Sequence, residues 1–122
     1  MERIDEFTLD GKNFVFIDLY GMKENSEFIK MAESTKSIIV KYPLNSLHTI
    51  TNIDNVRFDS ETKIFLADYM AHNKPYVKHG AIIGFDGIKK IMGNSICKMV
   101  GRPTMHFAFT KEKAIEWLLQ QE

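Results

Sequence analysis

The sequence predicts one α/β domain with a mainly parallel sheet, and three observations support this prediction. Apolar runs typical of buried strands alternate with segments of helical periodicity. An Asp10-Gly11 pair lies between the first two runs, where a tight hairpin needs positive φ angles. Strands that alternate with helices require crossover connections, which make the strands parallel. We therefore expect a single-layer, mainly parallel sheet with one antiparallel edge strand, helices packed on it, and the order ββαβαβαβα over residues 1–122.

The N-terminal half supplies the hairpin, one further strand and two helices. Residues 7–9 alternate as an edge strand does, and residues 13–17 are apolar almost throughout, as in a strand covered on both faces. A helix is expected from Asn25 to Tyr42, a strand over 46–53, and a second helix from Asp59-Ser60 to residues 73–75. The residues expected to face inward are Phe28, Ile29, Ala32, Ile39 and Val40 in the first helix, and Ile64, Phe65, Leu66, Tyr69 and Met70 in the second.

The C-terminal half repeats the strand–helix alternation twice. A strand is expected over 76–85, a helix from Asp86-Gly87 to residues 101–103, a short strand over 105–109, and a last helix capped by Thr110. Helical spacing selects the residues expected to face inward, which are Ile88, Ile91, Met92, Ile96 and Met99 in the third helix and Ala114, Ile115, Trp117, Leu118 and Leu119 in the last.

Composition excludes several classes of protein. Lys and Arg number 16, as do Asp and Glu, so the chain is not basic enough overall to indicate a nucleic-acid binder. Cys97 is the only cysteine, which excludes an intrachain disulfide and favours a reducing compartment. The polar N-terminus and the short apolar runs predict neither a signal peptide nor membrane insertion. We therefore expect a cytoplasmic protein.

The charge is unevenly distributed along the chain. Residues 1–70 carry a net charge of −4, whereas residues 71–103 carry +5, with Asp86 as their one acidic residue. A molecule polarised in this way could steer an acidic partner to one side.

Chemistry-bearing residues do not form a recognisable catalytic motif. The four histidines have no metal-ligand spacing, and His48 and His106 are expected to be hydrogen-bonded structural residues within strands. Cys97 lies beside an apolar helix stripe, where a buried structural role is favoured over a reactive one. We therefore predict no enzymatic activity, no metal and no cofactor.

Two helix starts are candidate binding sites. Asp59-Ser60 is typical of a helix cap, but a phosphate on Ser60 would also be stabilised by the helix dipole, so the pair could act as a switch. Gly84-Phe85-Asp86-Gly87 follows a strand and opens a helix, which suits either a tight turn or an anion site. Lys89 and Lys90 favour the anion, whereas Asp86 opposes it.

The chain also resembles the STAS-type family, the fold of bacterial anti-sigma-factor antagonists, and more narrowly a bacterial branch grouped with lipid-transfer CRAL-TRIO domains. The resemblance runs from about Asn13 to Leu119. It rests on Arg57-Phe58-Asp59, residues 73–78, 84–89 and 114–118, and Gly101-Arg102.

The resemblance implies a domain that works by binding. In the antagonists a serine at the start of a helix is phosphorylated by a partner kinase, and Ser60 occupies the matching position here. The chain departs from that motif at Glu61-Thr62-Lys63, where the family favours small residues. A phosphate on Ser60 would be repelled by Glu61.

Two hypotheses of function follow. The first is a regulatory protein-interaction module with an unidentified protein partner. Its contacts would come from Arg57, Asp59, Ser60, Gly84, Asp86, Gly87, Lys89, Lys90 and Arg102. The alternative is a carrier or sensor of an apolar or anionic small ligand. Met70, Met92, Met99 and Met105 would line its pocket, which should measure at least roughly a few hundred Å³.

Overall fold

The computed structural model describes residues 3–101 and 105–121 of the chain. Its elements follow the predicted order ββαβαβαβα. They are β1 (Ile4–Leu9), β2 (Lys12–Asp18), α1 (Asn25–Ile39), β3 (Leu47–Asn52), α2 (Ser60–Asn73), β4 (Val77–Ile83), α3 (Gly87–Val100), β5 (His106–Phe107) and α4 (Lys111–Leu119). Several elements are shorter than expected: α1 ends at Ile39 instead of Tyr42, the strand predicted over 76–85 covers Val77–Ile83, and the strand predicted over 105–109 keeps two residues.

The sheet has the strand order β1-β2-β3-β4-β5. The β1–β2 pair is antiparallel and the other three pairs are parallel, which confirms the predicted sheet. Asp10 and Gly11 adopt φ angles of 50° and 74° and form the predicted hairpin turn.

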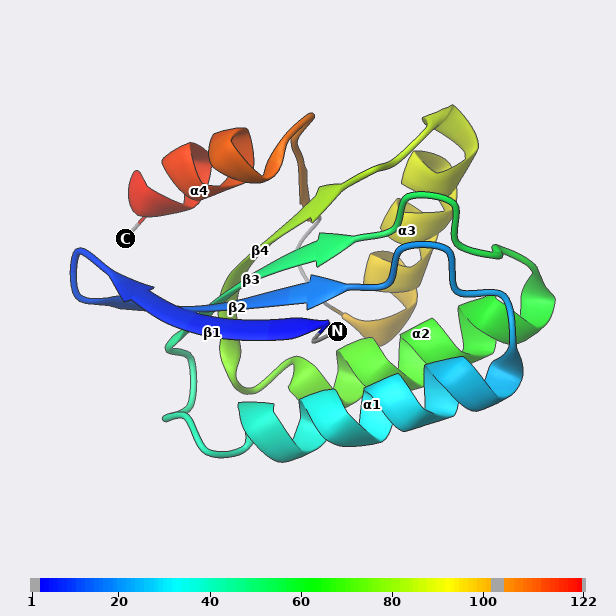
Figure 1. The fold of residues 1–122 in the computed structure, drawn as a ribbon, viewed down its shortest axis with the longest axis horizontal. Coiled ribbons are helices and arrows are strands. Elements are labelled where there is room, and N and C mark those ends of the chain that lie inside the picture. Colours follow the sequence, from blue (N-terminus) through cyan, green and yellow to red (C-terminus); the bar gives the residue numbers. More distant parts are fainter. Residues whose placement is uncertain (1–2, 102–104, 122) are drawn as a thin grey trace.

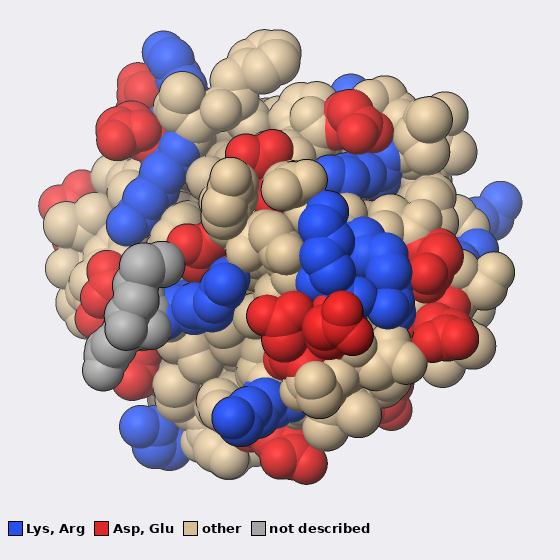
Figure 2. Space-filling view, turned by 45° about the vertical axis from the view of Figure 1, so that its right-hand side comes forward, with Lys and Arg blue, Asp and Glu red and all other residues tan. Residues whose placement is uncertain are grey.

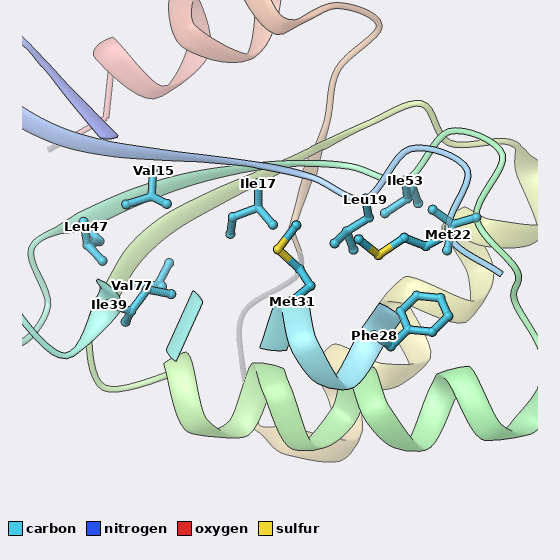
Figure 3. Packing of buried hydrophobic residues seen from close by; sticks show 11 residues of the cluster. Val15, Ile17, Leu19, Met22, Phe28, Met31, Ile39, Leu47, Ile53 and Val77 are labelled. Carbon is cyan, nitrogen blue, oxygen red and sulfur yellow. The ribbon is translucent and has the colours of Figure 1, made fainter. Parts of the chain in front are cut away.

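Helices cover both faces of the sheet (Figure 1), with α1, α2 and α3 on one side and α4 on the other. The larger core lies between the sheet and the first three helices, where Ile17 lies by Met31 of α1, and Val15 and Leu47 lie on the side of Ile39 (Figure 3). A smaller core lies under α4, around Phe14, Ile50 and Leu118. Because both faces are covered, β2 is apolar over residues 14–17, as expected.

Several residues predicted to face inward are exposed instead. Ile64, Ile88 and Ile91 are 71%, 71% and 72% exposed. For the two isoleucines of α3, the reason is that this helix turns Gly93, Ile96 and Cys97 toward the protein interior, on its other side. The other corrected residues are Ile29, Val40 and Met99.

His48 lies in the smaller core and was wrongly predicted to be hydrogen-bonded there. Its ring is 3% exposed, and Nδ1 has no hydrogen-bond partner among the described residues. The ring is held by neighbouring rings instead, with centroids 5.4 Å from Phe14 and 5.7 Å from His79. Burial, and then the charges of Lys12, His79 and Lys78, lower the pKa of His48 to about 4.

This lowered pKa predicts a loss of stability in mild acid. The unfolded chain takes up a proton near pH 6.5, whereas the folded chain excludes it until about pH 4. Stability should therefore be complete above pH 6.5 and fall by up to about 3 kcal/mol toward pH 4. Urea unfolding at a series of pH values measures this decline. His48→Phe should flatten it most clearly above about pH 5, before most carboxylates titrate, and an equal decline in the variant would contradict the assignment.

Two further features of the described residues bear on function. No helix among them is long and apolar enough to cross a membrane. Cys97 is 1% exposed, which confirms its predicted place in the apolar interior.

Candidate functional site

The candidate site lies where α2 and α3 begin, at the ends of the parallel strands β3 and β4. Asp59 caps α2, because its Oδ1 accepts hydrogen bonds from the Thr62 backbone N–H at 3.0 Å and from the Thr62 hydroxyl at 3.1 Å. The backbone bond is the main reason that the pKa of Asp59 is lowered. Ser60 is the first residue of α2 and is exposed. Its hydroxyl is therefore accessible to a modifying enzyme.

Arg57 joins the starts of α1 and α2. Its guanidinium donates from Nη1 to the Lys23 carbonyl at 2.6 Å and from Nη2 to the Asn25 side chain, and its Nε lies 3.0 Å from Asp59 Oδ2. It also lies over the Phe28 ring, 5.7 Å from the centroid. These internal contacts occupy the guanidinium, so an external anion would have to displace some of them.

The start of α3 is a tight turn, and the backbone N–H of its third residue is capped. Gly84 adopts φ +74°, and a Cβ there would come within 2.6 Å of the Asp54 backbone nitrogen. Asp86 Oδ1 accepts a hydrogen bond from the Lys89 backbone N–H at 2.8 Å. The Asp86 carboxylate therefore takes the place at the α3 start that an external anion would use.

Lys89 and Lys90 point to different surroundings. Lys89 Nζ donates to the Ile53 carbonyl at 3.1 Å and is part-buried. Lys90 is exposed, and its Nζ lies 5.9 Å from the Phe85 ring centroid and 5.3 Å from that of Phe107. Gly87 is the first residue of α3 and is exposed. Arg102, the remaining residue of the predicted set, lies outside the described residues.

Helices α2 and α3 lie side by side, and Lys63 Nζ is 3.4 Å from Ser95 Oγ between them. The outer side of this pair carries an α2–α3 face, which we define as Ser60, Ile64, Ile88 and Ile91. Ser60 was among the residues predicted from the sequence to form a site, whereas the three isoleucines were predicted to face inward. Their spacing fitted an inward stripe, and the sequence held no signal of how far each helix is rotated.

The charges near the helix starts are mixed in sign. Figure 2 turns the helix starts of Figure 1 forward, and basic and acidic side chains alternate across the visible face. The opposite net charges of residues 1–70 and 71–103 therefore do not produce a surface of one sign on this side of the molecule.

A cavity of about 60 Å³ lies between the sheet and helices α2 and α3. Met70 and Met105 line it, two of the four methionines that the carrier hypothesis named, whereas Met99 is 65% exposed. The cavity is much smaller than the few hundred Å³ expected of a carrier. Among the described residues, no group of three or more His, Cys, Asp or Glu side chains could hold a metal ion.

Comparison with solved structures identifies the fold. An uncharacterised protein of the DUF3478 family from Shewanella loihica PV-4, described as having a SpoIIAA-like fold, aligns with a TM-score of 0.73 and 13% identity over 94% of this chain and 91% of its own. The anti-sigma factor antagonist SpoIIAA in its unphosphorylated form aligns with a TM-score of 0.62 and 16% identity over 98% of both chains.

These alignments confirm the STAS-type, SpoIIAA-like fold that the resemblance implied. No protein-family model and no curated protein matches the chain. The likeness therefore concerns the fold.

Proposed function

We propose that this chain is a non-catalytic regulatory module that binds a protein partner through its α2–α3 face. The observation that carries the proposal is the exposure of Ile64, Ile88 and Ile91, each more than 70% exposed, on the adjoining helices α2 and α3, the first of which begins at Ser60. Clustered exposed apolar side chains rimmed by polar groups are typical of protein-interaction surfaces. The similarity in fold to an anti-sigma factor antagonist also supports a binding role.

Ser60 is the proposed switch of this face. A phosphate on its hydroxyl would add negative charge beside Asp59 and Glu61, while Arg57 is already engaged by internal acceptors. The helix dipole attracts such a phosphate, but the two carboxylates repel it. Because Ser60 is exposed, we expect phosphorylation to change docking rather than folding.

Substituting one isoleucine should separate docking from folding. Ile91→Asp places a charge on the α2–α3 face, which should weaken partner binding by about a hundredfold, the effect of a typical hot-spot loss. Ile29→Asp is the matched control, since Ile29 is 45% exposed on α1. Both variants should keep the stability of the wild type within about 1 kcal/mol.

Native mass spectrometry of protein purified gently from its own cells measures this prediction. The wild type and Ile29→Asp should carry the mass of a bound protein, and Ile91→Asp should not. High salt should weaken the complex, because the charges around the face are exposed to screening. Partner binding that survives in Ile91→Asp would contradict the proposed face, and a persistent phosphate that maps to Ser60 would support the switch.

A further inference from the structure

The cavity under α2 and α3 combines apolar walls with polar side chains, which are those of Thr49, Thr51, Tyr69, Asn73 and Lys89. Its walls include Ile17, Leu66 and Ile96. Thr49 and Thr51 follow one another on the same side of β3, and Lys89 of α3 lies where β3 ends, at the carbonyl of Ile53.

The two threonines place hydroxyl groups on the wall of the cavity. Thr49 is 4% and Thr51 is 8% exposed, and both line the cavity. A hydroxyl group on a cavity wall is open to hydrogen bonding with a molecule that enters the cavity. Each hydroxyl can donate one hydrogen bond to a ligand that enters the cavity.

Lys89 indicates the charge of a ligand that would fit this cavity. Its side chain is part-buried and lines the cavity, and its one hydrogen bond among the described residues goes from Nζ to the Ile53 carbonyl. No carboxylate of the described residues lies within ion-pair distance of Nζ. An ammonium group has three donors, so two remain for an anion. A part-buried cation without a counter-ion favours a ligand that brings one.

We propose that this cavity binds a short-chain aliphatic carboxylate. The carboxylate would accept hydrogen bonds from Lys89 Nζ and the Thr51 hydroxyl, and the alkyl chain would lie against the apolar walls beside Met70. The volume of about 60 Å³ limits the ligand to about four to six non-hydrogen atoms, the size range from acetate to butyrate. Recognition of such a ligand goes beyond partner docking, because it uses the interior rather than the outer face of α2 and α3.

Titration with butyrate, followed by the isoleucine methyl NMR signals at constant ionic strength, tests the proposal. Signals of Ile82 and Ile96, which line the cavity, should shift, while that of Ile29 on the outside of α1 should not. Butyramide has the same size without the charge and should bind about ten- to a hundredfold more weakly. Octanoate is too long for the cavity and should bind no more tightly than butyrate.

Two lysine variants complete the test. Lys89→Met should weaken butyrate binding about tenfold or more and leave butyramide binding unchanged, because it removes the cation and keeps an apolar stem of similar length. Lys90→Met is the matched control and should bind butyrate as the wild type does. Either the absence of shifts at Ile82 and Ile96 or equal butyrate affinities of the two variants would overturn the proposal. Neither result depends on a protein partner, so failure here is distinguishable from failure of the docking face.

Discussion

Gly84→Ala is expected to destabilise the protein by about 3 kcal/mol or more. The φ of +74° costs a residue with a Cβ about 1–2 kcal/mol. The new Cβ would also meet the Asn52 side chain, and would lie 2.6 Å from the Asp54 backbone nitrogen and 2.7 Å from the Asp54 Cβ. Backbone cannot move aside as a flexible side chain can, so relief of this clash must shift the turn that starts α3.

Gly11→Ala is the matched control for this prediction. Gly11 has the same φ of +74°, but no atom lies within 4 Å of a Cβ built there. It should lose only about 1–2 kcal/mol, the cost of the backbone conformation. Urea unfolding measures both variants. Equal losses would contradict the account of Gly84 as a point of close approach between two loops.

Arg57→Met is expected to cost about 2–4 kcal/mol of folding free energy. The methionine keeps a stem that can pack on Phe28 but leaves the Lys23 carbonyl and the Asn25 side chain without their charged donor. Hydrogen bonds from a charged group contribute about 1.5–3 kcal/mol each where they are not fully exposed. We therefore expect most of the lost folding free energy to come from the missing link between the starts of α1 and α2.

Lys36→Met tests whether the loss of any contact between α1 and α2 would lower the folding free energy as much as Arg57→Met does. Lys36 Nζ lies 2.9 Å from Asp68 Oδ2, which also joins α1 to α2, and its side chain is 28% exposed against 27% for Arg57. Because this is a single ion pair whose partner is 75% exposed, its loss should cost at most about 1 kcal/mol. A cost equal to that of Arg57→Met in urea unfolding would contradict the special role of the Arg57 network.

Local signals in the sequence predict most of the fold. The Asp10-Gly11 turn, the Asp59, Asp86 and Thr110 caps and the order of elements depend on neighbouring residues, and all are confirmed. Helix rotation depends on tertiary packing instead. Ile88 and Ile91 have the spacing of a buried stripe, but Ile96 and Cys97 on another side of α3 are the buried residues.

The candidate site is less predictable from the sequence, because its contacts also depend on tertiary packing. Ser60 is visible in the sequence because a helix cap precedes it. The contacts of Arg57 are not, because Lys23 and Asn25 lie 34 and 32 residues away in the chain. The cavity joins Thr49 and Thr51 of one strand to Lys89 of a distant helix. The alternation of threonines with Ile50 in that strand was the one available signal of a polar lining.

Site-specific photo-crosslinking in the protein's own cells tests the central claim most directly. A photoreactive residue at position 91 samples the α2–α3 face, and one at position 29 samples the outer side of α1. The docking account predicts one defined protein adduct from position 91 and none from position 29, with a weaker adduct when Ser60 is replaced by aspartate. Equal adducts from both positions, or an adduct from position 29 alone, would contradict it.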